Sequence, residues 1–207
     1  MPKETLIAIG AGVLSAILAT AFLSRVPGAL FFVYLASLPL FMAGLALGPK
    51  AGMISSAVGF MAVGLVGGSL SAGVFGLMQA LPAWMIVRQM LLQRPAGVGP
   101  GPESGQGAAI EWYSPGDMLC WLTMLAAGML VFMAVAAAGE NGLLALVALN
   151  LEQILQSIAP QMDPGRLEAT GGIMAPLFPG VAGVSWLLMI IVNVSLAQGL
   201  LVSWAIT

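Results

Sequence analysis

A single lysine interrupts two long apolar stretches, and this arrangement constrains the fold more than any other feature. Residues 26–49 carry no charge, and neither do residues 51–87. In soluble domains about a quarter of the residues are charged, whereas only 7% of this chain is. Runs of about 20 apolar residues match the ~30 Å hydrocarbon core of a bilayer. The sequence therefore predicts membrane-spanning helices, with residues 48–52 (Gly-Pro-Lys-Ala-Gly) as a tight hairpin between two of them.

The distribution of apolar stretches predicts an all-α integral membrane protein, a six-transmembrane-helix bundle forming a single domain over residues 1–207. Pro39 is expected to kink the second helix, because neighbouring helices in lipid can satisfy the carbonyls that a proline frees. A Gly-Gly-Ser break at 67–69 separates the third helix from the fourth. The expected spans are about 5–24, 29–47, 51–66, 70–92, 117–138 and 181–204.

Two segments between the spans have a different character. Residues 94–116 begin with a Pro/Gly-rich linker that predicts a flexible loop. In residues 142–159 the apolar side chains recur at helical spacing on one face and the polar side chains occupy the other. This pattern predicts an amphipathic helix that lies in the membrane interface or caps the bundle, not a span.

The basic residues near the spans predict the orientation. An orientation with the N-terminus inside places four of them in the cytoplasm (Lys3, Lys50, Arg88 and Arg94) and two outside (Arg25 and Arg166). The excess favours a cytoplasmic N-terminus. Residues 19–21 (Ala-Thr-Ala) suit a signal-peptide cleavage site, but the single preceding lysine favours a retained helix. No charge follows the last span, which leaves open a natural chain that continues beyond Thr207.

Chemistry-bearing residues are scarce. The chain has no histidine and one cysteine, Cys120, which excludes an internal disulfide, a Cys/His zinc cluster and a Ser-His-Asp triad. No phosphate-binding Gly-x-x-x-x-Gly-Lys-Ser/Thr motif is present. The net charge of −2 gives no reason to expect nucleic acid as a partner. We therefore expect neither an enzyme nor a cofactor, and any energy for transport must come from a gradient or a partner.

Two sets of residues in the spans are candidates for function. Small residues recur at every fourth position of the first span, where they let another backbone approach closely, either a helix of this chain or a partner subunit. These are Ala8, Gly12, Ala16 and Thr20. Uncharged polar residues lie deep in other spans, where they either form interhelical hydrogen bonds or line a ligand site. These are Tyr34, Ser37, Gln79 and Asn193.

The hairpin at 48–52, followed by a Gly/Ala-rich span, resembles the S components of energy-coupling-factor (ECF) vitamin transporters. The small-residue stripe of the first span is similar to the face with which those proteins meet their coupling subunit. Residues 80–84 (Ala-Leu-Pro-Ala-Trp) and 111–116 (Glu-Trp-Tyr-Ser-Pro-Gly) resemble the YybS-like family of bacterial membrane proteins, whose chains tend to be longer. The resemblance implies an S-component-like bundle in the inner (plasma) membrane of a bacterium, with a ligand site in its outer half. The chain has no recognisable vitamin-contacting motif.

Two functions from different classes follow. The first is a binding subunit that captures a small metabolite for uptake and depends on a membrane coupling subunit and a separate ATPase module. The second is a non-transporting membrane scaffold that anchors a protein complex through the 94–116 loop. Co-purification of a small molecule or of an ATPase module distinguishes the two.

Overall fold

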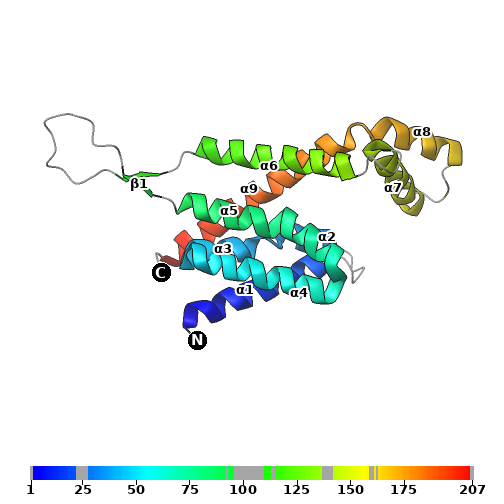
Figure 1. Cartoon of the computed structure of the whole chain (residues 1–207). Coiled ribbons are helices and arrows are strands. Elements are labelled where there is room, and N and C mark those ends of the chain that lie inside the picture. Colours follow the sequence, from blue (N-terminus) through cyan, green and yellow to red (C-terminus); the bar gives the residue numbers. More distant parts are fainter. Residues whose placement is uncertain are drawn as a thin grey trace, which may run out of the picture. The chain divides into compact units, whose positions relative to one another are not determined.

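The computed structural model describes residues 2–21, 28–91, 93–95, 110–112, 115–136, 142–158, 161 and 163–205. These residues are helical apart from turns and one short two-stranded ladder (Figure 1). The chain divides into two compact units, of which the first is Met1–Leu119 with Met189–Thr207 and the second is Cys120–Leu188.

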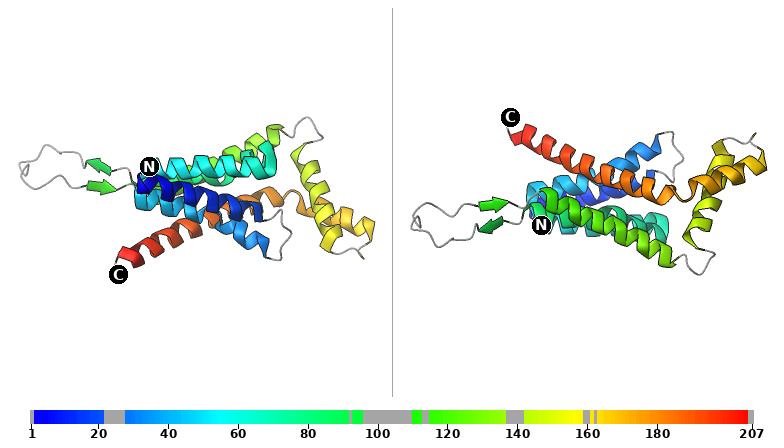
Figure 2. Two further views of the ribbon diagram at one scale, coloured as in Figure 1. Left: turned by 90° about the horizontal axis from the view of Figure 1, so that it is seen from below. Right: turned by 90° about the horizontal axis from the view of Figure 1, so that it is seen from above.

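The first unit contains the N-terminal helices, the ladder and the C-terminal part of the last helix. Its elements are α1 (Lys3–Thr20), α2 (Ala29–Leu35), α3 (Leu38–Leu47), α4 (Pro49–Phe75), the π-helical turn η2 (Gly76–Ala80), α5 (Leu81–Met90), β1 (Gln93–Pro95) and β2 (Ile110–Trp112). Strands β1 and β2 pair antiparallel, with Arg94 opposite Glu111. Helices α1, α3 and α4 pack against one another, which both views of Figure 2 show.

The predicted hairpin at residues 48–52 is confirmed. Gly48 has φ +95°, a conformation that other residues rarely adopt, and Pro49 starts α4 where a missing N–H is harmless. Gly44 and Gly52 face each other across this turn, and the fully buried Val87 of α5 packs on both. The two glycines therefore make room for a third helix at the hairpin.

A second hairpin is centred on Gly68, inside the 42-residue apolar stretch Pro49–Met90. Gly68 has φ +80° and ψ 176°, which are not helical. Residues at equal distances along the chain before and after Gly68 contact each other. Gly64 faces Ala72, and the Ser56 hydroxyl donates to the Ala80 carbonyl at 3.3 Å. The stretch thus consists of two antiparallel arms of about 20 residues, each ~30 Å long, and the predicted break at 67–69 is confirmed.

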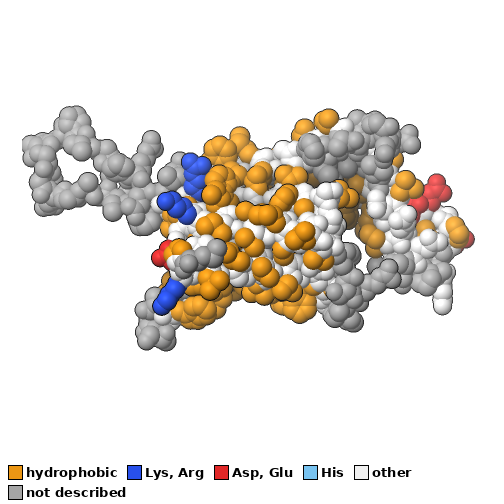
Figure 3. Space-filling view, turned by 60° about the horizontal axis from the view of Figure 1, so that its bottom comes forward, with side chains coloured by type: hydrophobic (Ala, Val, Ile, Leu, Met, Phe, Trp, Pro, Cys, Tyr) orange, Lys and Arg blue, Asp and Glu red, His pale blue; other side chains and the backbone are white. Residues whose placement is uncertain are grey.

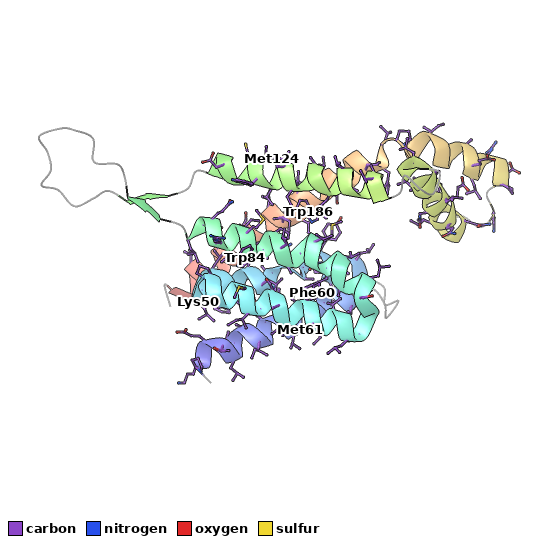
Figure 4. All side chains as sticks on the ribbon, in the orientation of Figure 1. Lys50, Phe60, Met61, Trp84, Met124 and Trp186 are labelled. Carbon is purple, nitrogen blue, oxygen red and sulfur yellow. The ribbon has the colours of Figure 1, made fainter. Side chains whose placement is uncertain are left out.

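Figure 4 shows two neighbouring side chains, Phe60 and Met61, on the first arm of this hairpin. The ring of Phe60 packs on Gly76 of the returning arm. The next residue, Met61, points away and is 61% exposed. An exposed methionine in the charge-free part of this helix is suited to contact with lipid.

The expected count of six spanning helices is not matched. Within the described residues, four stretches are long and apolar enough to span a membrane by length and composition. They are Lys3–Thr20, Ala29–Leu47, Pro49–Met90 and Phe178–Trp204. The count differs because the stretch Pro49–Met90 contains both the third and the fourth expected spans, and because the apolar described part of the fifth expected span is only Leu119–Val131.

Large apolar side chains cover the outside of the spanning helices. Leu65, Leu70 and Phe31 are 88%, 83% and 65% exposed. The space-filling view in Figure 3 shows hydrophobic side chains spread along the helices, with lysine and arginine at one end. Such a surface would be unstable in water, so these helices are suited to a lipid bilayer.

The second unit holds most of α6 (Pro115–Ala136), α7 (Leu143–Ile158), α8 (Pro164–Met174) and the start of α9 (Phe178–Ala205). Helix α7 confirms the helix predicted at 142–159, and its position along the membrane surface stays a prediction. It packs on α8, where Gly171 lies against Glu152 and the Ala148 carbonyl. Helix α8 was not predicted, although Asp163-Pro164 is a common helix start.

Candidate binding site at an interrupted helix

The expected span 29–47 is interrupted in its middle. Pro39 has no N–H and its ring clashes with a carbonyl one turn earlier, so α2 ends at Leu35 and α3 begins at Leu38. The turn between them is tight, because the Ala36 N–H donates to the Val33 carbonyl at 3.2 Å. Backbone carbonyls at the end of α2 therefore need donors from other helices.

Side chains of α1 and α9 supply two of these donors. The Ser15 hydroxyl of α1 donates to the Ala36 carbonyl. The Asn193 Nδ2 of α9 donates to the Tyr34 carbonyl at 2.7 Å and to the carbonyl of Met189 in its own helix, also at 2.7 Å. Both hydrogens of the Asn193 amide are thus used, and its orientation is fixed because only the nitrogen can donate.

Gln79 supplies a third donor, from the π-helical turn. Its Nε2 donates to the Val33 carbonyl at 3.4 Å. Pro82 explains the wide turn, since it lacks an N–H and the Leu81 N–H reaches back five residues to the Gly76 carbonyl. The π turn places Gln79 inside the bundle, where the side chain is 6% exposed.

Three buried polar atoms at this break have no hydrogen-bond partner among the described residues. They are Ser37 Oγ, Gln79 Oε1 and Asn193 Oδ1. The three side chains, here called the polar cluster, are 0%, 6% and 1% exposed. An unsatisfied buried polar group costs about 1–3 kcal/mol, so three at one break need an explanation and make this break the candidate site.

The backbone brings the polar cluster together. Ala36 and Ser37 keep right-handed helical dihedrals, so Ser37 lies one turn beyond Val33 and Tyr34, over their face of the helix. The Gln79 and Asn193 amides bind the carbonyls of those same two residues. The Gln79 and Asn193 side chains thus meet the helix beside Ser37, at the point where it is interrupted.

The structure places all four polar candidates from the sequence at this break, but one of them differently than expected. The Tyr34 side chain is 44% exposed, and the residue contributes its backbone carbonyl. Ser15 and the Val33 carbonyl were missed. Pro39 indicated where carbonyls would be freed, and Ser15 is a polar residue in the small-residue first span. Nothing in the sequence indicated that Ser15 would lie against the helix break before Pro39.

The small-residue stripe of α1 lies inside the first unit. Ala8 and Ala16 are 0% and 5% exposed, and a Cβ added at Gly12 would overlap the Ser55 carbonyl of α4. The Thr20 hydroxyl donates within its own helix, to the Ala16 carbonyl at 2.8 Å. This burial favours internal packing, one of the two interpretations that the sequence left open, over docking of a partner.

Basic side chains gather at one end of the helices of the first unit (Figure 3). Lys50 lies in the first turn of α4 and Arg88 in the last turn of α5. The hairpin at Gly68 brings these two helix ends together. The Arg88 guanidinium lies 5.6 Å from the ring centre of Trp84, a cation–π geometry. Arginine beside tryptophan at a helix end is typical of a membrane–water boundary.

No group of three or more histidine, cysteine, aspartate or glutamate residues among the described residues could hold a metal ion. The polar cluster consists of uncharged oxygen atoms instead. Comparison of the chain with protein-family models, with curated proteins and with solved structures found no match.

Proposed function

We propose that this chain is a multi-pass protein of the bacterial inner membrane that binds a small polar solute at the polar cluster, as a substrate-binding subunit of an uptake system. The three buried oxygens without partners carry the proposal. Uncharged polar groups inside a membrane protein usually satisfy one another, and the donors at this break are instead all directed at backbone carbonyls.

The chemistry of the cluster limits the solute. Amide oxygens only accept hydrogen bonds, and a serine hydroxyl can do so too. The solute therefore presents N–H or O–H groups or a positive charge, and not a carboxylate or phosphate. The likeness to S components and to the YybS-like family is part of this proposal and agrees with a site that lies between helices.

Energy would come from a separate ATPase module, because the chain has no phosphate-binding motif. The α1 stripe no longer supports a coupling subunit as the partner, since Ala8, Gly12 and Ala16 are buried within the chain. A coupling subunit would have to meet another face of the helices.

A membrane scaffold is the second candidate, and the burial of the α1 stripe favours it. A scaffold needs no ligand site, and it would anchor its complex through the 94–116 loop. It leaves the three unpartnered oxygens without a role.

The test is purification of the full chain in mild detergent, followed by native mass spectrometry. The proposal expects a small molecule that co-purifies with the chain and is lost in the variant Gln79→Leu, which keeps the side-chain size but removes the amide. The matched control is Leu77→Ala on the same π turn, whose side chain is 42% exposed. This control should retain the molecule.

Two results contradict the proposal. One is a chain that carries no small molecule and co-purifies with a stable protein complex, which supports the scaffold. The other is a molecule that both variants retain equally, which places its site elsewhere.

A further inference from the structure

We infer that the polar cluster is a site for a small monovalent cation, with the sodium ion as the best-fitting probe. The inference deepens the proposed function, on which it rests for the role of the cluster as a ligand site. Ser37 Oγ, Gln79 Oε1 and Asn193 Oδ1 are its proposed protein ligands.

The directions of the amide hydrogen bonds favour a cation over an anion. Asn193 uses both amide hydrogens on the Tyr34 and Met189 carbonyls. Gln79 directs its amide nitrogen at the Val33 carbonyl. Both amides must therefore turn their oxygens away from these carbonyls, and an array of oxygen acceptors attracts positive charge.

The absence of a carboxylate from the polar cluster selects a single positive charge. Magnesium and calcium sites use carboxylates to balance two charges, and none of the three cluster residues is acidic. Neutral oxygens at an unwound membrane helix are a known way to coordinate sodium, because the helix end adds a partial negative charge. The C-terminal end of α2, which is followed by Ala36 and Ser37, supplies such a partial charge.

The enclosure of the cluster selects a small occupant. Ser37 and Asn193 are 0% and 1% exposed, and Gln79 is 6% exposed. A metabolite of vitamin size would leave its binding side chains open to a cavity once removed. A dehydrated alkali ion needs far less space than such a metabolite.

A cation site at this break changes the energetics of the proposed function. Binding a sodium ion from outside would couple the state of α2 and α3 to the sodium gradient, in addition to the ATPase module of the proposed function. The ion is then either the cargo or the driving ion for a second solute. In both cases its binding can be measured with the ion alone.

The experiment measures thermal unfolding of the purified full chain by tryptophan fluorescence, at constant ionic strength, in sodium, potassium or N-methylglucamine chloride. A ligand that binds only the folded state raises the melting temperature in a concentration-dependent way. We expect a saturable rise with sodium and a smaller rise or none with potassium. N-methylglucamine is too large to enter.

The variant Ser37→Ala provides the decisive comparison. Its lost hydroxyl has no partner in the protein, so without sodium the variant should be as stable as the original chain or more stable. Its apparent sodium affinity should fall at least about tenfold, which corresponds to one lost ligand contact of ~1.4 kcal/mol. The control is Ser55→Ala, which removes an equally buried hydroxyl bonded to the Gly52 carbonyl of the same helix at 3.0 Å. Its sodium affinity should be unchanged.

Identical melting in all three salts overturns the inference, because a cation that binds the folded chain would raise its melting temperature. An equal loss of sodium response in both serine variants also overturns it, because the effect then lies in stability and not in the site. A chain that binds sodium but no solute refutes the proposed uptake of a metabolite alone. A chain that binds a solute with no sodium dependence refutes the cation site alone.

Discussion

The contact at Gly12 has no room for even one carbon atom. A Cβ at this position would overlap the Ser55 carbonyl oxygen, which belongs to the backbone of α4 and cannot turn aside. We expect Gly12→Ala to destabilise the chain by about 1–3 kcal/mol, the usual cost of overpacking. Thermal unfolding in detergent measures the effect.

Gly10 provides the control on the same helix. An added Cβ there meets no atom within 4 Å, so Gly10→Ala should be neutral or stabilise the helix by up to about 1 kcal/mol. Equal stability of the two variants, with loss of a co-purifying partner only in Gly12→Ala, would restore the docking interpretation of α1.

Single residues also show how far the sequence could predict the site. Ser37, Gln79 and Asn193 could be identified because a polar side chain is conspicuous in an uncharged span. The hydrogen-bond partners of Gln79 and Asn193 could not be predicted, because such partners lie far away in the chain. The Asn193 amide, for example, binds a carbonyl 159 positions earlier. Such pairings depend on how the helices pack, and no local pattern encodes them.

At the scale of elements, the hairpin between α4 and α5 depends on the backbone of Gly68. Its φ of +80° is strained for any residue with a Cβ. We expect Gly68→Ala to lower the free energy of unfolding by roughly 1 kcal/mol or more. Gly73→Ala is the control, since Gly73 has a helical backbone and no atom within 4 Å of an added Cβ. Chemical denaturation of the two variants tests this, and equal midpoints would contradict it.

Helix boundaries were predictable where proline and glycine act locally. The turns at Gly48 and Gly68 follow from those residues, and so does the break before Pro39. The helix α8 was not predicted, although Pro164 is favourable at the first position of a helix. A proline or glycine therefore marked several boundaries, but not always which side of the boundary was helical.

At the scale of the whole molecule, the orientation in the membrane remains to be measured. Lys50 and Arg88 lie at the end of the first unit that is opposite the Gly68 turn. The excess of basic residues predicts that this end is cytoplasmic. In a Cys120→Ser background, a cysteine at the exposed position Ser69 should react with a membrane-impermeant thiol reagent on intact cells. A cysteine at Pro2 should react only after lysis, and the reverse pattern would invert the topology.

The short helix α2 determines how the enclosed cluster could exchange its occupant. Leu30, Phe31 and Phe32 of α2 are 63%, 65% and 43% exposed, so little packing holds this element. Three side-chain bonds tie its end to other helices. At the ~0.6 kcal/mol measured for such bonds in membranes, they total about 2 kcal/mol. That energy corresponds to a population of roughly 3% in which α2 is detached. The bonds that enclose the three oxygens therefore also set the fraction of molecules in which the cluster is open towards lipid.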